Sequence, residues 1–140
     1  MTDRTAAEAT PFQINIVVAD MDRALAFYRL LGWEPRVTGP HASLSFDNGF
    51  TVDFDTQEFA EHWNHAAPPL APGSIVLNLM MGERETVDAA WQRLVDAGHD
   101  GRQAPYDAFW GARYAIVADP DGYQIGLMSR SSDEHRSTPP

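Results

Sequence analysis

Cysteine is absent from the 140-residue sequence, and so is any long apolar run. Without cysteine the protein can form no disulfide, thiolate metal site or cysteine nucleophile. No stretch approaches the ~20 apolar residues that a membrane-spanning helix requires. The first ten residues are polar and rich in alanine, unlike a basic start followed by an apolar run. We therefore expect a cytoplasmic protein with no membrane partner.

Basic residues are scarce. Ten Lys and Arg residues stand against twenty Asp and Glu, which gives a formal net charge of -10. Phosphate binding requires a basic face, so this charge disfavours nucleic acid as a partner. It would favour a cationic partner, although an acidic surface that keeps the protein soluble is the simpler explanation. The sequence also lacks a glycine-rich phosphate loop and a nucleophile paired with a base.

Hydrophobic periodicity predicts the same order of elements twice. Alternating or short apolar runs predict strands at residues 12–19, 34–37, 42–46, 50–55, 74–80, 101–104 and in the hairpin 113–129. Apolar positions at helical spacing predict helices at 21–31 and 83–97, each ended by a glycine. Residues 56–73 are irregular, with room for a helical turn or two before Pro68-Pro69. The pattern is βαβββ, a linker, and βαβββ again.

This pattern predicts one domain over residues 12–129. Module one covers 12–55, the linker covers 56–73 and module two covers 74–129. Residues 1–11 and 130–140 are polar, and we expect both to be disordered tails.

The hairpin at 113–129 is joined by a turn with strong sequence chemistry. Proline fixes φ at Pro120, and Gly122 is free to adopt a positive φ. Asp119 and Asp121 flank the proline and could be read as paired carboxylates for acid–base work. Turn chemistry accounts for both of them, so we assign them no catalytic role.

The two faces of this hairpin depend on its register. If Ala118 pairs with Tyr123, Ile116 lies beside Ile125 on a core face. The other face, which could line a cavity, then carries Arg113, Ala115, Val117, Gln124, Gly126 and Met128.

Two segments resemble the vicinal oxygen chelate superfamily, which contains glyoxalase I, extradiol dioxygenases, fosfomycin-modifying enzymes and bleomycin-binding proteins. Residues 16–35 (IVVADMDRALAFYRLLGWEP) are similar to the family's first strand and helix. Residues 110–128 (WGARYAIVADPDGYQIGLM) are similar to its last hairpin. The resemblance spans about residues 12–129. It implies an α+β fold of two tandem βαβββ modules, each curling a sheet into a half-barrel, with a cavity between the sheets.

The resemblance also identifies four positions at which metal-binding members supply ligands. Here they are Gln13, Asp53, Ser74 and Gly126. Glycine has no side chain, and a neutral serine is a poor ligand. Glutamine and aspartate alone do not supply the roughly three protein ligands that retain a catalytic divalent ion. The two-histidine, one-carboxylate iron set of the dioxygenases is missing too. We expect no metal and no cofactor.

A polar lining with aromatic residues at its mouth is the candidate ligand site. Its residues are Gln13, Asn15, Asp53, Asp55, Ser74, Asn78, Tyr106, Asp107, Phe109, Trp110, Arg113 and Gln124. Loops commonly carry binding groups, which favours a ligand role for the aromatic loop 106–111. A plug at the barrel mouth or a dimer interface remains the close alternative. A buried Arg113 should pair with Asp53, Asp55 or Asp107, or with a ligand anion.

The histidines of the linker offer a weaker candidate. His62 and His65 are three residues apart, with Glu58 and Glu61 beside them, which could suggest a metal site. The segment is polar and has no apolar shell, so we interpret it as solvated surface or cavity rim. Trp63 and Phe59 of the same segment have the same alternatives as the aromatic loop: a ligand contact, or a plug or dimer interface.

The prediction is a metal-free protein of the bleomycin-resistance type with no catalytic residues, which sequesters a small organic ligand, planar or cationic, through stacking and cation–π contact. One alternative is a glyoxalase-like lyase or isomerase, or a dioxygenase relative. A second is a structural or regulatory dimer with a vestigial cavity. Exposed sheet edges and aromatic loops predict a homodimer.

Overall fold

A computed structural model describes residues 11–66, 68–73 and 75–139. The expected N-terminal tail, apart from Pro11, therefore lies outside the described residues. The chain forms two compact units, which are described separately. The first comprises residues up to Met21 and Glu34–Leu70, and the second comprises Asp22–Trp33 and residues from Ala71 onward.

The first unit contains a four-stranded sheet and one helix. Its strands are β1 (Gln13–Val18), β2 (Arg36–Thr38), β3 (His41–Ser45) and β4 (Thr51–Thr56), in the order β1-β4-β3-β2. β1 is parallel to β4, and the other pairs are antiparallel. Helix α2 (Gln57–Trp63) follows β4 directly, because Thr56 caps it by accepting the N–H of Phe59. The irregular linker thus contains a two-turn helix.

The alternation of β1, β3 and β4 separates two chemically different faces of this sheet. The register places Asn15 opposite Asp53, and Asp53 opposite Ser43. Polar side chains therefore share one face. The buried apolar residues of the other face are Ile16, Val18, Ala42, Val52 and Phe54.

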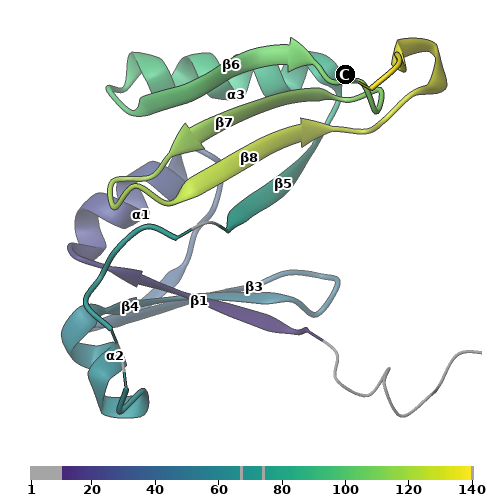
Figure 1. The fold of residues 1–140 in the computed structure, drawn as a ribbon. Helices are drawn as coiled ribbons and strands as arrows, with labels where there is room; N and C mark the ends of the chain where they lie inside the picture. The colour runs from purple at the N-terminus through teal and green to yellow at the C-terminus, as the bar shows by residue number, and fades with distance from the viewer. Residues whose placement is uncertain (1–10, 67, 74, 140) are drawn as a thin grey trace, which may run out of the picture. The chain divides into compact units, whose positions relative to one another are not determined.

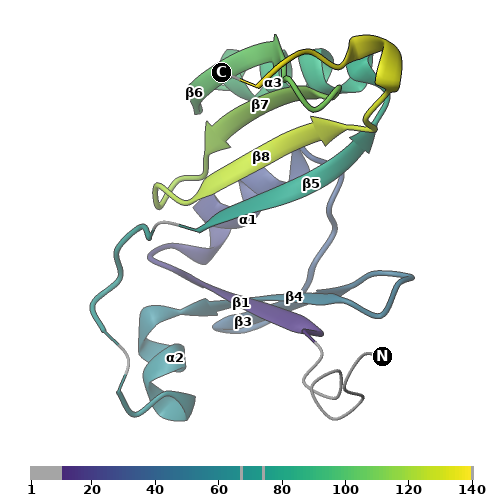
Figure 2. The ribbon, with the colours of Figure 1, turned by 45° about the vertical axis from the view of Figure 1, so that its right-hand side comes forward.

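The second unit contains the other sheet. Its strands are β5 (Val76–Gly82), β6 (Asp100–Asp107), β7 (Arg113–Ala118) and β8 (Gln124–Ser129), in the order β5-β8-β7-β6. Helix α3 (Arg84–Asp96) lies along one face of this sheet, as the two views in Figures 1 and 2 show. The helix buries Val87, Ala90 and Leu94. We call the face of this sheet opposite α3 the open face.

Helix α1 (Met21–Arg29) belongs to the second unit from Asp22 onward. Phe27 packs edge-on against His99, at 5.0 Å between ring centroids. The hydroxyl of Tyr28 donates to Oδ2 of Asp119 at 2.8 Å, and both side chains are buried. Burial, with the nearby Asp119 charge, raises the pKa of Tyr28. The helix of the first βαβββ pattern thus packs with the sheet of the second.

The expected register of the β7–β8 hairpin is wrong by one residue. Ala118 pairs with Gln124, and Ile116 lies opposite Gly126. The reason is the side chain of Asp119, whose Oδ1 accepts the N–H groups of both Asp121 and Tyr123 and so includes Tyr123 in the turn.

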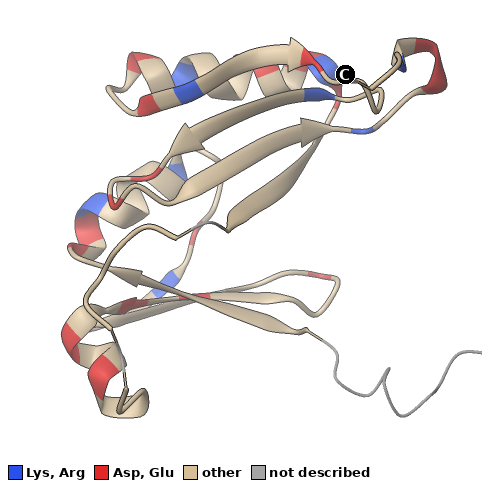
Figure 3. Cartoon of the chain, in the orientation of Figure 1, with Lys and Arg blue, Asp and Glu red and all other residues tan. Residues whose placement is uncertain are grey.

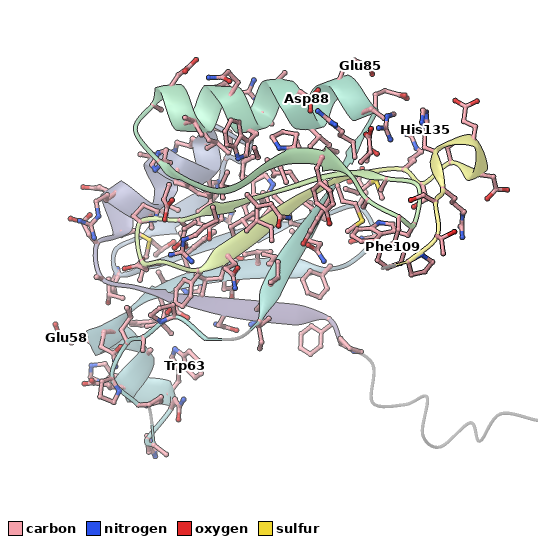
Figure 4. All side chains as sticks on the ribbon, turned by 45° about the horizontal axis from the view of Figure 1, so that its top comes forward. Glu58, Trp63, Glu85, Asp88, Phe109 and His135 are labelled. Atoms are coloured by element: carbon pink, nitrogen blue, oxygen red, sulfur yellow. The ribbon has the colours of Figure 1, made fainter. Side chains whose placement is uncertain are left out.

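A one-residue shift moves every side chain of one strand to the opposite face. Arg113 therefore lies on the helix-covered face, where its Nε donates to Asp88 of α3 at 2.8 Å. Figure 4 labels Asp88 on this helix. Tyr114 takes its place on the open face, with Gln124 and Gly126.

The C-terminal segment also differs from the expected disordered tail. It forms a 3-10 turn at Asp133–His135, and Arg136 makes an isolated bridge with Trp110. Backbone N–H groups of Ser132 and Ser137 donate to Gly111 and Phe109. Backbone carbonyls of the aromatic loop thus hold the C-terminal segment in place, which the polar composition of that segment does not predict. Figure 4 labels Phe109 in the loop and His135 in the segment.

In the described residues, two four-stranded sheets and three α-helices make an α+β fold with the predicted repeat of βαβββ, and both sheets are open. No helix in the described part of the chain is long and apolar enough to cross a membrane.

Candidate functional site

Six polar side chains form a connected surface on the first sheet, which we call the polar face. They are Gln13, Asn15, His41, Ser43, Asp53 and Asp55. Three neighbouring strands, β1, β4 and β3, supply them in pairs. The alternation of each strand brings both members of a pair to the same side.

Asp55 is the centre of the polar face and is fully buried, at 0% exposure. Its Oδ2 accepts from Nδ2 of Asn15 at 2.9 Å, and its Oδ1 lies 2.6 Å from Nδ1 of His41. Gln13 extends the chain by donating to Oδ1 of Asn15 at 2.8 Å. The burial of Asp55 is thus compensated by two polar partners.

Asp53 lies beside this chain and stays partly accessible. Its Oδ1 accepts from the hydroxyl of Ser43 at 2.6 Å. Its Oδ2 lies 3.8 Å from Nε2 of His41, an ion-pair distance that is too long for a hydrogen bond. The imidazole of His41 therefore stands between two carboxylates.

A second surface lies on the open face of the other sheet. We call it the aromatic platform, and it consists of Asn78, Tyr106, Trp110, Tyr114 and Gln124. Tyr114 packs against Trp110 at 5.5 Å and Tyr106 at 6.4 Å between ring centroids. Burial, with Tyr106 nearby, raises the pKa of the Tyr114 hydroxyl.

Gly126 forms the floor of the platform. The Tyr114 hydroxyl donates to Oδ1 of Asn78 at 2.9 Å, and this pair covers the glycine. A Cβ built on Gly126 would collide with Oδ1 of Asn78 and the Tyr114 ring. Only glycine lets these two side chains meet here.

The aromatic loop adds exposed apolar area next to the platform. Phe109 contacts Trp110 edge-on at 5.2 Å, and the exposed fractions of Phe109 and Tyr106 are 40% and 41%. The predicted aromatic residues Tyr106, Phe109 and Trp110 are thus brought together. Asn78 and Gln124 share their sheet face.

Arg113 and Asp107 instead form an ion-pair network with Asp88 and Arg84. Asp107 accepts from Arg113 at 3.1 Å and from Arg84. Its pKa is lowered, because these two arginines outweigh the opposing effect of desolvation. The hydrogen bond to Asp88 is the largest cause that raises the pKa of Arg113. Of the expected partners of Arg113, Asp107 is present, and the network neutralises Arg113 without a ligand anion.

Of the four family metal positions, the three that the structure describes do not fit a metal ion. The side-chain amide of Gln13 donates a hydrogen bond to Asn15, and Asp53 accepts one from the Ser43 hydroxyl. The space above Gly126 is filled by Asn78 and Tyr114, and Ser74 lies outside the described residues. Within residues 11–66, 68–73 and 75–139, no group of three or more His, Cys, Asp or Glu side chains is arranged to hold a metal.

A shallow pocket of about 190 Å³ lies where α2 meets β3 and β4. Its lining residues are Pro40, Thr56, Glu58, Phe59 and His62. Phe59 also contacts His41, at 5.7 Å between ring centroids. His62 therefore lies at a pocket rim, next to an α2 surface whose charged side chains are acidic (Figure 3).

The sequence matches the Glyoxalase/Bleomycin resistance protein/Dioxygenase superfamily over residues 10–127, and the chain belongs to that superfamily. The uncharacterized protein Mb0911c of Mycobacterium bovis is 33% identical over 124 residues, covering 81% of this chain and 78% of that protein.

Solved structures agree on the fold. A glyoxalase-related enzyme from Fulvimarina pelagi has a TM-score of 0.79 and 22% identity, covering 87% of this chain and 88% of its own. A glyoxalase/bleomycin resistance protein/dioxygenase from Burkholderia phytofirmans PsJN has a TM-score of 0.70 and 19% identity, covering 84% and 95%. At these identities the likeness shows the fold alone.

Sequence reasoning missed His41, Ser43 and Tyr114. The alternation of residues 41–45 could have predicted the first two. In the hairpin around Asn48-Gly49, His41 pairs with Asp55 and Ser43 pairs with Asp53, so all four side chains lie on one face. Tyr114 was hidden by the wrong hairpin register.

Proposed function

We propose that this protein binds a small organic ligand without a metal, as a sequestering member of its superfamily. The observation that carries the proposal is the Tyr114–Asn78 hydrogen bond over Gly126. It puts an aromatic ring and an amide at a position where metal-binding members carry a glutamate. The Tyr114 ring, fixed by this bond and next to the rings of Tyr106 and Trp110, favours stacking of a ligand. The Asn78 amide favours directed hydrogen bonds to it.

The proposed ligand is planar or cationic. Exposed rings at Tyr106 and Phe109 suit stacking and cation–π contact. Asp53 and Asp55 on the polar face, and a formal charge of -10, favour a positive ligand. Each surface supports this ligand class independently of the other.

A thermal-shift comparison of matched compounds tests this proposal. Aromatic amidines should raise Tm in a concentration-dependent way, while the neutral amides of the same shape should raise it less. Trp110→Ala and Tyr114→Phe should weaken the shift. Arg102→Gln, whose side chain pairs with Asp100 on its own strand, should leave it unchanged. If neither compound series changes Tm, the binding proposal fails.

The enzyme alternative, a glyoxalase-like lyase or isomerase, has a separate test. It would require a divalent ion held by Gln13, Asp53 and a further ligand. Elemental analysis of protein purified without chelator should find less than stoichiometric metal. Near-unit occupancy of one metal, lost in Asp53→Asn, would favour the enzyme.

We also propose that the protein is a cytoplasmic homodimer. Exposed aromatic residues and open sheet edges are commonly covered by a second copy. Because two chains of charge -10 repel, the dimer should tighten with added salt. Sedimentation equilibrium at several salt concentrations measures this, and a monomer at tens of micromolar protein would exclude it. A dimer that binds no compound would favour the second alternative, a structural or regulatory dimer.

A further inference from the structure

We infer that the Asp55–His41 pair is a proton-accepting dyad, in which Nε2 of His41 acts as a general base toward water on the polar face. This goes beyond holding a ligand, because it gives the first sheet a chemical activity. It is carried by the hydrogen-bond chain that ends at His41.

The chain determines where the neutral imidazole carries its proton. An ionised carboxylate can only accept hydrogen bonds. Asp55 accepts from Asn15 through Oδ2, so its Oδ1 requires a donor from His41, 2.6 Å away. The proton of the neutral ring therefore lies on Nδ1, and the lone pair lies on Nε2. A buried aspartate orients its histidine in the same way in hydrolytic triads.

The side chain of His41 is accessible to water, and the lone pair of its Nε2 accepts no hydrogen bond from Asp53. The His41 side chain is 31% exposed, whereas the Asp55 side chain is 1% exposed. The nearest described carboxylate, Oδ2 of Asp53, is 3.8 Å away and does not occupy the lone pair. Asp55 and Asp53 are the carboxylates that face this ring, from the two sides of the imidazole.

Water is the nucleophile that this arrangement can activate. The Ser43 hydroxyl donates to Asp53 and so is not offered to His41. In the proposed step a water proton moves to Nε2 while the water oxygen bonds to the carbonyl carbon of an activated ester. The bond from that carbon to the leaving oxygen then breaks. Nε2 returns the proton to the leaving group, which gives an acid and an alcohol or phenol.

Nitrogen-15 NMR of the imidazole tests the geometric half of the inference. The neutral His41 ring should show the Nδ1–H tautomer. Asp55→Asn should shift it toward Nε2–H, because an amide can donate to Nδ1. A wild-type ring in the Nε2–H tautomer would contradict the inference.

Hydrolysis of p-nitrophenyl acetate tests the chemical half. Wild-type protein should exceed the buffer rate, and His41→Gln should lower this excess by about 10²-fold, as expected for loss of a general base. Asp55→Asn should lower it by roughly tenfold or more through the wrong tautomer. Should Asp55→Asn fail to fold, Asn15→Ala, which removes one of the two hydrogen bonds on Asp55, should lower the rate less.

His135→Gln is the matched control, because this histidine is exposed in the C-terminal turn. Its hydrolysis rate should equal that of the wild type. Equal rates for His41→Gln and wild type would overturn the inference. That outcome would not affect the thermal-shift result, so the binding proposal and this one fail separately.

Discussion

The Tyr114 hydroxyl donates to Oδ1 of Asn78 at 2.9 Å, across the space that any side chain at position 126 would need. Position 126 on the last strand therefore requires glycine, because a Cβ there would collide with both side chains. This contact also explains physically why the aromatic platform and a metal-ligating carboxylate exclude each other in this chain.

Gly126→Ala should therefore destabilise the protein by ~1–3 kcal/mol, the usual cost of overpacking. Gly126→Glu should cost at least as much and should bind no divalent ion. Urea unfolding measures both. Gly73→Ala is the matched control, because Gly73 has open space around its Cβ position and should change stability by less than ~0.5 kcal/mol. A Gly126→Ala variant as stable as wild type would contradict the packing described here.

Tyr28→Phe should lower the free energy of unfolding by ~1–3 kcal/mol, because it leaves Oδ2 of the buried Asp119 without its donor. Tyr106→Phe removes an exposed hydroxyl and should change stability by under ~0.5 kcal/mol. Chemical denaturation distinguishes the two. Similar values for both variants would mean that the Tyr28–Asp119 bond contributes little.

The repeated βαβββ order was predictable because periodicity reports which side of a strand or helix is buried. The register of the last hairpin was not, because it depends on two hydrogen bonds that Asp119 accepts within the turn. The unit to which α1 belongs was equally hidden, since the Tyr28–Asp119 contact joins residues 91 apart in sequence. Local patterns do not encode such distant pairs.

In the candidate site too, local patterns predicted some residues, and others depended on contacts between distant parts of the chain. Aromatic residues in a loop predicted Tyr106, Phe109 and Trp110, which the fold brings together. Arg113 was placed on the open face because a single-residue slip reverses orientation. His41 was overlooked because its role arises only when β3 pairs with β4.

The corrected register predicts coupling between Arg113 and Asp88. A double-mutant cycle with Arg113→Gln and Asp88→Asn should give a coupling energy of ~0.2–1 kcal/mol, as for other partly exposed ion pairs. Salt should reduce it. The pair Arg113 and Asp53, which the original register made plausible, should show additive effects. Coupling to Asp53 in place of Asp88 would restore the original register.

His99 should make stability depend on pH. Burial lowers its pKa below the ordinary value of 6.5, although the nearby Asp119 charge opposes this effect. The unfolded chain therefore binds a proton at a pH where the folded chain does not. The stability that neutral His99 provides is complete above 6.5 and is lost as pH falls from there through the lowered pKa.

His99→Gln should flatten the decline of unfolding free energy in that window, measured by urea denaturation at a series of pH values. His135→Gln, at an exposed position, should leave the slope of the wild type unchanged. The edge-on contact between His99 and Phe27 gives a second reading, because Phe27→Leu opens this site to water and should bring the His99 pKa closer to 6.5. An unaltered slope in His99→Gln would place the titrating group elsewhere.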